Sequence, residues 1–235
     1  MSKVGNKTLR KVAIFDIDGT VFRSSLLVEL VETLIARGIF PEEAWSDYQR
    51  EERAWLEREG SYEAYVSAIV LSFRKHLRGV HYADFLDVSK EVVIHSQNRV
   101  YRYTRDLVKD LKRRGYYLLA ISQSPKTVVE SFAKHVGFDK VYGRIYELGP
   151  EDHFTGDLVD VHLIENKANI VRRAVEREGL TLNSSYGVGD TEGDIPMLEL
   201  VKYPIAFNPN AKLYRYARRM GWRIVVERKD VIYKF

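Results

Sequence analysis

The sequence KVAIFDIDGT, residues 11–20, joins a short apolar run to two closely spaced carboxylates. Residues 12–15 predict a buried parallel strand, because such strands carry apolar residues on both faces. In open α/β sheets chemistry is found at the carboxyl ends of strands, which is where Asp16 and Asp18 would lie. An extended chain points these two side chains the same way and turns Ile17 aside. Like charges this close require a cation between them, or a proton on one of them, and hard carboxylate oxygens suit Mg²⁺.

The segment that follows is expected to be helical throughout. Leu26, Leu30 and Leu34 share one face of a predicted helix, and Ser61 is placed as the N-cap of a later one. No strand pattern occurs between about residues 24 and 97. This segment is therefore predicted to form a small helical bundle inserted into the chain.

From residue 98 onward, helical and strand patterns alternate. Expected strands cover residues 116–121, 140–148, 184–188, 203–207 and 223–226, and expected helices cover residues 99–114, 125–137, 164–179, 196–201 and 211–220. A β-hairpin is predicted at residues 149–160, with its turn near Thr155-Gly156. Alternation of this kind predicts a parallel sheet with helices on both faces. We therefore expect an α/β protein, with a core of residues 1–23 and 98–235 and a helical domain of residues 24–97.

The composition is that of an ordinary globular protein. Of the 235 residues, 45% are hydrophobic and 30% are charged, and there is no cysteine. No apolar run approaches the ~20 residues needed to span a bilayer, and residues 1–10 do not resemble a secretory signal. We therefore expect a cytoplasmic protein that has no membrane partner and contains no disulfide.

The net charge of +4 raises the question of nucleic-acid binding. The basic residues are mixed with acidic ones, and clusters such as residues 112–114 lie where helices are expected to end. Cations at that position oppose the negative end of the helix dipole. Nucleic acid is therefore not an expected partner, whereas a mildly basic surface favours a phosphorylated small molecule.

Three downstream segments carry side chains suited to phosphate chemistry. Ser122 ends the apolar run LLAIS, where a hydroxyl and helix-entry N–H groups could bind a phosphate oxygen, although such a serine is more often a turn residue or cap. Lys167 lies near the start of a helix, a position that is mildly unfavourable for a cation unless an anion meets it. A solvated lysine is the common alternative. The segment GVGDTEGDIPML places Asp190 and Asp194 after a strand, and paired carboxylates again require a cation.

Taken in order, DxDGT at residues 16–20, Ser122, Lys167 and GDxxxD at residues 189–194 resemble the four motifs of the haloacid dehalogenase-like (HAD) hydrolase superfamily. Asp18-Gly19 alone would be typical of a turn, whereas four motifs in this order at strand ends are specific. The resemblance spans essentially the whole chain and is to subfamily IB, the phosphoserine-phosphatase-like group. It implies a Rossmann-like core and an inserted helical cap of the C1 type.

The resemblance also implies a role for each motif residue. Asp16 would be the nucleophile that forms an aspartyl-phosphate, and Asp18 would act as general acid and then general base. Mg²⁺ would be held by Asp16, Asp190 and the backbone carbonyl of Asp18. Asp194 would complete the metal site or orient Lys167, which neutralises the phosphoryl group. The residues expected to bind the substrate or its phosphoryl oxygens are Gly19, Thr20, Arg23, Ser122, Gln123 and Lys167.

The predicted function is a Mg²⁺-dependent phosphatase that hydrolyses a small phosphorylated metabolite, as a monomer or homodimer. A phosphotransferase or phosphomutase with the same aspartyl-phosphate chemistry is one alternative, and a non-catalytic regulatory module is another. A dehalogenase is disfavoured, because that chemistry needs neither an acid at Asp18 nor a metal at Asp190.

Three departures from the phosphoserine phosphatase pattern concern the substrate. Ser25 stands where those enzymes carry a glutamate that binds the substrate amine. Gly193 stands in place of an asparagine, and Ser122-Gln123-Ser124 in place of Ser-Gly-Gly. We therefore expect no preference for phosphoserine over phosphate esters that lack an amine.

Overall fold

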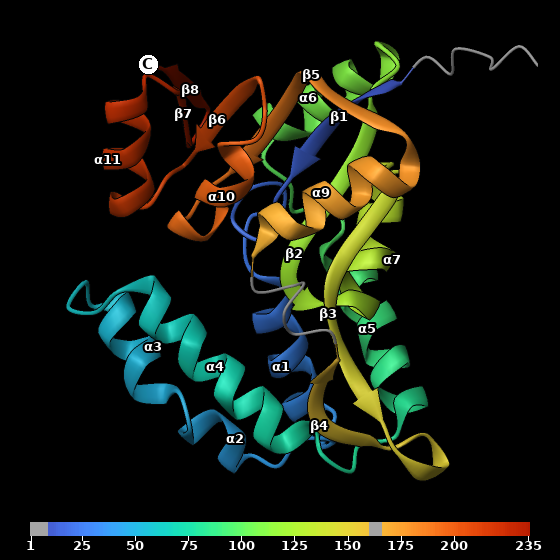
Figure 1. Ribbon diagram of the computed structural model, residues 1–235. Helices are drawn as coiled ribbons and strands as arrows, with labels where there is room; N and C mark the ends of the chain where they lie inside the picture. The colour runs from blue at the N-terminus through green and yellow to red at the C-terminus, as the bar shows by residue number, and fades with distance from the viewer. Residues whose placement is uncertain (1–8, 160–165) are drawn as a thin grey trace, which may run out of the picture.

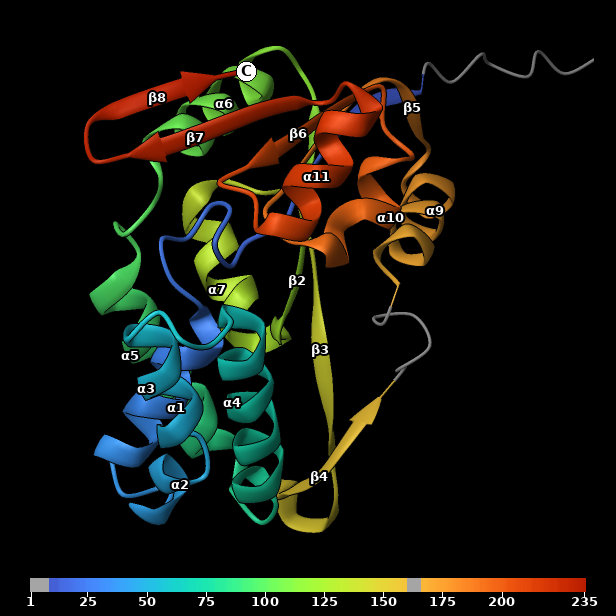
Figure 2. The same ribbon diagram turned by 90° about the vertical axis from the view of Figure 1, so that its left-hand side faces the viewer.

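The computed structural model describes residues 9–159 and 166–235 of the chain. Within these ranges eight strands form one sheet in the order β4-β3-β2-β1-β5-β6-β7-β8 (Figures 1 and 2). The strands are β1 (Arg10–Phe15), β2 (Tyr117–Pro125), β3 (Lys140–Leu148), β4 (Phe154–Val159), β5 (Leu180–Gly189), β6 (Tyr203–Phe207), β7 (Arg223–Arg228) and β8 (Val231–Lys234). Neighbours from β3 to β7 pair in parallel, and β4 and β8 close the edges as antiparallel strands. The predicted α/β class with a Rossmann-like parallel sheet is confirmed.

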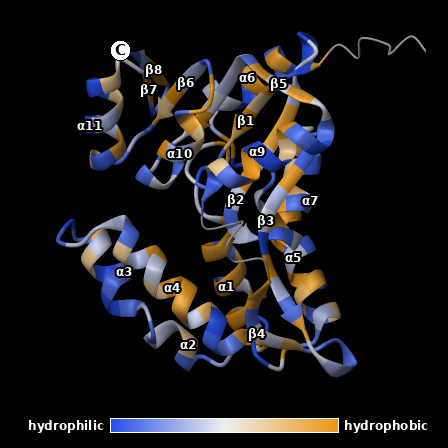
Figure 3. Ribbon diagram, viewed as in Figure 1, coloured by the Kyte–Doolittle hydropathy of each residue, from blue (hydrophilic) through white to orange (hydrophobic). Residues whose placement is uncertain are grey.

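The helices form the segment between β1 and α6 (Arg102–Arg113) and the two layers that cover the faces of the sheet. They are α1 (Leu26–Ala36), α2 (Glu43–Ser46), α3 (Gln49–Leu56), α4 (Tyr62–Leu77), α5 (Tyr82–Ser96), α6 (Arg102–Arg113), α7 (Lys126–Val136), α9 (Lys167–Glu178), α10 (Ile195–Leu198) and α11 (Ala211–Met220). Ala13 and Phe15 of β1 share a core with α6 and α7, whereas Val12 and Ile14 share a core with α9, α10 and α11. The central strands are accordingly hydrophobic, and the polar residues lie mainly on the outer helix faces (Figure 3).

The position of β1 explains its uninterrupted apolar run. It lies between β2 and β5 in the middle of the sheet, and Val12–Phe15 are fully buried. Burial of each large apolar side chain contributes roughly 1.5–3 kcal/mol. The backbone N–H of Asp16 still donates to the carbonyl of Val188 at 2.9 Å, so the ladder with β5 continues one residue past the strand. The carboxylate at this position therefore projects from a fixed backbone.

The segment between β1 and α6 is helical and lies beyond the carboxyl ends of the central strands (Figure 1). The six buried residues of α1 include Leu26, Leu30 and Leu34, as their spacing predicts. The hydroxyl of Ser61 accepts a hydrogen bond from the N–H of Ala64 at 3.1 Å, which confirms the predicted N-cap. The division into a core and a domain of residues 24–97 stays a prediction.

The β3–β4 hairpin extends from the sheet onto this helical segment. The rings of Phe73 and Tyr146 lie 5.2 Å apart, and those of Phe85 and Phe154 lie 5.0 Å apart. The N–H of Gly79 also donates to the carbonyl of Phe154 at 2.8 Å. The helical segment is therefore attached to the core at this side as well as through its two chain connections.

The predicted position of the hairpin turn is wrong. Thr155 and Gly156 lie inside β4, and the chain reverses at residues 149–153, around the short 3₁₀ helix η1 (Pro150–Asp152). Glu151 and Asp152 have positive φ angles of 53° and 57°. The segment GPED at residues 149–152 contains Gly, Pro and Asp, which are turn formers, so a local turn signal was present here as well as at Thr155-Gly156.

Several element boundaries also differ from those predicted. β2 continues past Ser122 to Pro125, β5 begins at Leu180, and β8 is an additional strand. The helix expected from residue 164 begins at Lys167 in the structure, and residues 164 and 165 lie outside the described ranges.

Candidate active site

Three motif segments meet at the carboxyl end of the sheet. Asp16 follows β1, Asp190 follows β5, and Ser122 lies near the end of β2, which borders β1 on the other side. Lys167 is the first residue of α9, and Asp194 ends the short 3₁₀ helix η2 (Glu192–Asp194). The fold thus gathers residues that are up to 178 positions apart in the sequence.

A buried lysine joins two of the carboxylates. Lys167 Nζ lies 2.5 Å from Asp16 Oδ1 and 2.5 Å from Asp194 Oδ1, and the lysine is only 4% exposed. Burial by itself would lower the pKa of Lys167, but the two carboxylates outweigh that effect and raise the pKa above its ordinary value. The lysine is therefore a permanent ammonium group in the site, which explains why a cation can lie at this helix start.

Asp16 has one bound and one free carboxylate oxygen. Oδ1 accepts from Lys167, whereas Oδ2 is buried and has no hydrogen-bond partner among the described residues. Burial raises the pKa of Asp16 to about 7; Lys167 opposes this rise, and the charges of Asp194 and Asp18 add to it. A buried carboxylate oxygen without a donor is costly, so this position suits a cation or a proton.

Asp190 completes the acidic group. Its Oδ1 accepts from the hydroxyl of Thr20 at 3.1 Å. Burial raises the pKa of Asp190 well above its ordinary value, and the Asp16 and Asp194 charges raise it further. Carboxylate oxygens of all three aspartates lie within 4.8 Å of one another. Hard oxygen ligands at this density, with one orphaned oxygen among them, fit a divalent cation such as Mg²⁺.

Gly19 permits the close approach of Asp190. The φ angle of Gly19 is +76°, and a Cβ added there would lie 2.2 Å from Asp190 Oδ2. Only glycine satisfies both the backbone conformation and the space. The glycine of the DxDGT segment is therefore required by the position of an aspartate 171 residues later.

Both carboxylate oxygens of Asp194 are engaged in hydrogen bonds that position neighbouring groups. Its Oδ2 accepts from the N–H groups of Asp190 and Thr191, both at 3.0 Å, while its Oδ1 binds Lys167. Both oxygens thus have donors. Of the two roles that the sequence left open for Asp194, the geometry favours orientation of Lys167 and of the Asp190 loop over direct metal binding.

Asp18 has hydrogen-bond partners of its own, outside the Asp16–Asp190–Asp194 cluster. Its Oδ1 accepts from the N–H of Leu26 at 2.6 Å, at the start of α1. Its Oδ2 accepts from the hydroxyls of Ser122 at 2.5 Å and Ser124 at 2.9 Å. Ser122 therefore contacts Asp18 directly. Ser124 was missed by the sequence analysis, although residues two apart in an extended strand face the same side.

The remaining predicted residues lie around this centre. Gln123 Oε1 accepts from Arg144 Nε at 2.8 Å, a partner that the sequence did not indicate. Arg23 is exposed, and its guanidinium lies 5.6 Å from the centre of the Tyr101 ring. Tyr62, in the first turn of α4, was likewise missed. Burial raises the pKa of Tyr62, and the Asp18 and Asp190 charges add to the rise.

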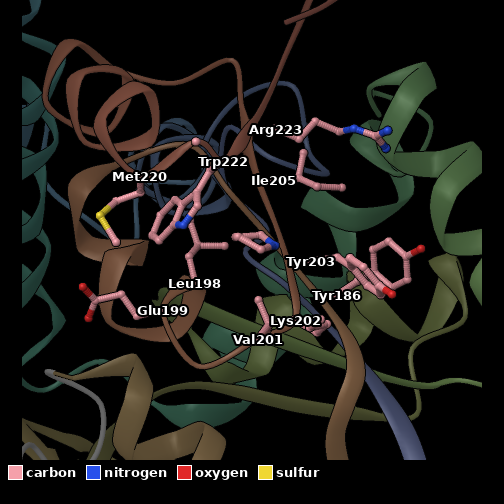
Figure 4. Close-up of a pocket in the computed structure, with 12 residues that line it drawn as sticks. Tyr186, Leu198, Glu199, Val201, Lys202, Tyr203, Ile205, Met220, Trp222 and Arg223 are labelled. Carbon is pink, nitrogen blue, oxygen red and sulfur yellow. The ribbon is translucent and has the colours of Figure 1, made fainter.

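A separate cavity of about 840 Å³ lies elsewhere in the molecule. Tyr203 and Arg223, at the amino ends of β6 and β7, line it together with Trp222 and Met220 (Figure 4). The carboxylate cluster lies at the opposite, carboxyl end of the parallel strands. This cavity is therefore distinct from the candidate active site.

None of the helices in the described ranges combines the length and the apolarity that crossing a bilayer requires.

Comparison with known proteins gives concordant results. A family model described as haloacid dehalogenase-like hydrolase matches residues 13–199. The chain is 29% identical over 223 residues to phosphoserine phosphatase SerB1 of Mycobacterium tuberculosis, which covers 92% of this chain and 70% of that protein. It is 24% identical over 229 residues to the histidinol-phosphatase of Neisseria meningitidis, which covers 92% of this chain and 99% of that protein. A solved phospho-aspartyl intermediate analogue of phosphoserine phosphatase has the same fold, with a TM-score of 0.61, 20% identity, and coverage of 94% of this chain and 95% of that chain.

Proposed function

The chain belongs to the haloacid dehalogenase-like hydrolase family, and from this premise we propose that it is a Mg²⁺-dependent phosphatase acting on a small phosphate monoester. Relatives named for the hydrolysis of phosphoserine and of histidinol phosphate support this proposal. The observation that carries it is the arrangement of Asp16. One oxygen lies 2.5 Å from Lys167 Nζ, and the other is buried without a partner among the described residues.

Asp16 is the nucleophile in this proposal. A carboxylate oxygen attacks phosphorus, a bond between that oxygen and phosphorus forms, and the bond from phosphorus to the leaving alcohol breaks. Lys167 is fixed between Asp16 and Asp194, so its positive charge needs no reorganisation as negative charge gathers on the phosphoryl oxygens. The product of this step is an aspartyl-phosphate on Asp16.

Asp18 moves the proton in both steps. It gives a proton to the leaving alcohol oxygen and later takes one from the water that attacks phosphorus. That attack breaks the bond to Asp16 and releases inorganic phosphate. Hydrogen bonds from Leu26, Ser122 and Ser124 hold the Asp18 carboxyl group in one orientation between the sheet and the start of α1.

The residues that would hold Mg²⁺ are Asp16, through its free oxygen, and Asp190, together with the backbone carbonyl of Asp18. No described residue donates a hydrogen bond to that carbonyl. When bound, the ion supplies the positive charge that allows a carboxylate to approach a phosphate dianion. Asp194 keeps the Asp190 loop in place through its contacts with two backbone N–H groups.

Hydrolysis of p-nitrophenyl phosphate by the full chain tests the proposal. We expect activity with Mg²⁺, and an at least thousandfold loss of kcat in Asp16→Asn, a lower bound because removal of a nucleophile can cost about 10⁶-fold. Asp87→Asn is the control, because that carboxylate is exposed on α5 and should leave activity unchanged. Thermal melting shows whether Asp16→Asn is folded. Full activity of Asp16→Asn, or undiminished hydrolysis in excess EDTA, would contradict the proposal. Phosphate appearing on an added alcohol instead of in solution would favour the phosphotransferase.

A further inference from the structure

Two serine hydroxyls reach the same oxygen of Asp18. Ser122 Oγ donates to Asp18 Oδ2 at 2.5 Å, and Ser124 Oγ donates to that oxygen at 2.9 Å. Both serines are buried, with 0% and 3% of their surfaces exposed. The other oxygen, Oδ1, accepts from the N–H of Leu26 at 2.6 Å. Asp18 Oδ2 therefore keeps a donor even when one of the two hydroxyls turns to another acceptor.

The backbone of β2 departs from regular pairing where it carries these serines. Ile121 pairs with Tyr142 of β3 and Pro125 pairs with Arg144, so β2 advances four residues while β3 advances two. Irregularities of this kind re-aim side chains next to active sites. The irregular stretch, residues 122–124, is the one that presents both hydroxyls to Asp18.

Gly143 of β3 lets the irregular stretch lie close to its neighbour. A Cβ added to Gly143 would lie 3.0 Å from the carbonyl oxygen of Ser124 and 2.7 Å from the Cα atom of Lys126. A side chain at position 143 would therefore push against the backbone that carries Ser124. The position of Ser124 is thus fixed by close packing within the sheet.

Ser122 has only one hydrogen to donate. A serine hydroxyl carries one hydrogen and can accept two. Ser122 Oγ accepts from the N–H of Ser124 at 2.9 Å and donates to Asp18. From its place at the end of β2, the sequence predicts that this same hydroxyl binds a phosphoryl oxygen. It cannot donate to both acceptors at once, so binding a phosphoryl group would take this donor from Asp18.

Ser124 supplies the donor that remains. Within residues 9–159 and 166–235, the hydroxyl of Ser124 donates to Asp18 alone. With Ser122 turned to a phosphoryl group, Ser124 and Leu26 would still hold the two oxygens of Asp18. A general acid acts only from within hydrogen-bond reach of the atom that it protonates. The orientation of Asp18 therefore bears directly on departure of the alcohol.

We propose that Ser124 is a positioning residue, which keeps Asp18 directed at the leaving oxygen while Ser122 donates to the phosphoryl group. The inference rests on the phosphatase function proposed above and gives two serines of that site separate tasks. The task of Ser122 concerns every phosphate ester equally, because all of them carry the phosphoryl group. The task of Ser124 matters most for esters whose leaving oxygen needs a proton.

Two esters that both carry a phenyl ring separate these tasks. p-Nitrophenolate is a weak base and leaves readily without a proton, whereas the alkoxide from benzyl phosphate is a strong base and needs one. With the full chain and Mg²⁺, we expect Ser124→Ala to lower kcat/KM for benzyl phosphate at least about tenfold, because a positioned acid contributes about 10²–10⁴-fold. For p-nitrophenyl phosphate the loss should be less than about threefold.

Ser122→Ala should give a different pattern. We expect it to lower kcat/KM for both esters by similar factors and to weaken inhibition by inorganic phosphate. Ser124→Ala should leave that inhibition unchanged, because its hydroxyl is directed at Asp18.

Ser131→Ala is the matched control, because the Ser131 hydroxyl donates to the carbonyl of Thr127 at 3.2 Å within α7. It should leave kcat/KM for both esters unchanged. Ser124→Cys keeps a side chain of similar size but replaces the hydroxyl by a weak thiol donor. It should therefore reduce the two kcat/KM values in the same unequal way as Ser124→Ala, and it carries the test if thermal melting shows that the alanine variant is unfolded.

Equal losses on the two esters in the Ser124 variants would overturn the inference, because a general disturbance of the site would affect both esters. Weaker inhibition by inorganic phosphate in Ser124→Ala would also overturn it, since that hydroxyl would then bind the phosphoryl group itself. Either result leaves the proposed function in place. A wild-type protein that is inactive on p-nitrophenyl phosphate overturns the proposed function itself.

Discussion

Gly19 is subject to two constraints that can be separated by experiment. An alanine there must adopt φ near +76°, and its Cβ would lie 2.2 Å from Asp190 Oδ2. Gly38 also has a positive φ, +66°, but nothing lies within 4 Å of its Cβ position. Positive φ alone costs about 1–2 kcal/mol of unfolding free energy for a residue with a Cβ. In urea unfolding Gly38→Ala should lose that amount, and Gly19→Ala should lose at least as much, because its Cβ also overlaps the Asp190 carboxylate.

Only Gly19→Ala should also lose function, because it displaces Asp190 from its position beside Asp16. We expect kcat of Gly19→Ala to fall at least about tenfold, with weaker Mg²⁺ binding, since a misplaced reactive group costs rate steeply. Gly38→Ala should keep wild-type kcat. Wild-type turnover in Gly19→Ala would show that the Asp190 position is not critical.

The raised pKa values of the motif carboxylates predict that metal binding depends on pH. Burial raises the pKa of Asp16 to about 7, so near pH 6 the metal-free protein holds a proton that a metal must displace. Raising the pH through about 7 removes that proton beforehand. Affinity for Mg²⁺ should therefore rise by up to about tenfold per pH unit below 7 for each proton displaced, and then level off.

Isothermal titration calorimetry measures this proton release directly. At about pH 6 the apparent enthalpy of Mg²⁺ binding should differ between buffers with different ionisation enthalpies, and at about pH 8 the difference should shrink. Equal enthalpies in both buffers at the lower pH would mean that Asp16 and Asp190 are already ionised without the metal.

At the scale of elements, strong local signals were sufficient for most of the fold. The Val12–Phe15 run lies in the central strand, and the cap at Ser61 is present as predicted. The hairpin turn was misplaced because Gly149-Pro150 and Thr155-Gly156 are both local turn signals, and the pairing of Leu148 with Phe154 selects the earlier one. Register in a hairpin depends on the turn type and loop length as well as on the hydrophobic pattern, so the pattern alone did not choose between the two turn positions.

The candidate site likewise contains residues that the sequence could reveal and one residue that it could not. The motif residues Asp16, Lys167, Asp190 and Asp194 could be found because their spacing is local to each strand end. Tyr62 could not, because it comes from a helix in another segment and resembles any half-buried tyrosine. The effect of the Asp18 charge on the pKa of Tyr62 follows only from the tertiary packing of α4 against α1, α3 and β4.

The N-cap of α4 controls the helix that carries Tyr62 and Tyr65. Ser61 Oγ accepts from the N–H of Ala64 at 3.1 Å, and replacing an N-cap serine by alanine costs about 1 kcal/mol. We expect Ser61→Ala to lower the free energy of unfolding by that amount in urea titrations. Ser67→Ala, an exposed serine within the same helix, is the control, and alanine there should be neutral or slightly stabilising. Equal effects of the two substitutions would contradict a capping role.

At the scale of the whole molecule, the helical segment meets the core in two different ways. On the hairpin side the contacts are aromatic, between Phe73 and Tyr146 and between Phe85 and Phe154. On the other side Lys212 of α11 bridges the two parts, with Nζ 3.1 Å from Glu63 Oε2 and 2.6 Å from Glu192 Oε1. Burial of the aromatic pairs is far stronger than an exposed ion pair. Movement of the helical segment should therefore begin at the Lys212 side and hinge near the hairpin.

The two ion pairs of Lys212 can be tested by their effect on KM. Glu63 follows Tyr62 in the first turn of α4, and Glu192 lies in the loop that carries Asp190, so the bridge ties the helical segment to the loop of the candidate site. Closure of such segments excludes water during the chemical step, and opening releases the product. Lys212→Met should therefore raise KM for p-nitrophenyl phosphate, but by no more than about fivefold, because Lys212 and Glu63 are 57% and 62% exposed and such pairs contribute at most about 1 kcal/mol.

The dependence of KM on NaCl concentration distinguishes loss of the Lys212 bridge from a general loss of positive charge. In the wild type, KM should rise with NaCl as the bridge is screened, and in Lys212→Met this dependence should be weaker. Lys75→Met is the matched control, because Lys75 forms a similarly exposed ion pair with Asp47 at 2.9 Å that lies wholly within the helical segment. If Lys212→Met has the KM and the salt dependence of Lys75→Met, the bridge does not hold the segment closed. The aromatic contacts at the hairpin would then be sufficient to set its position.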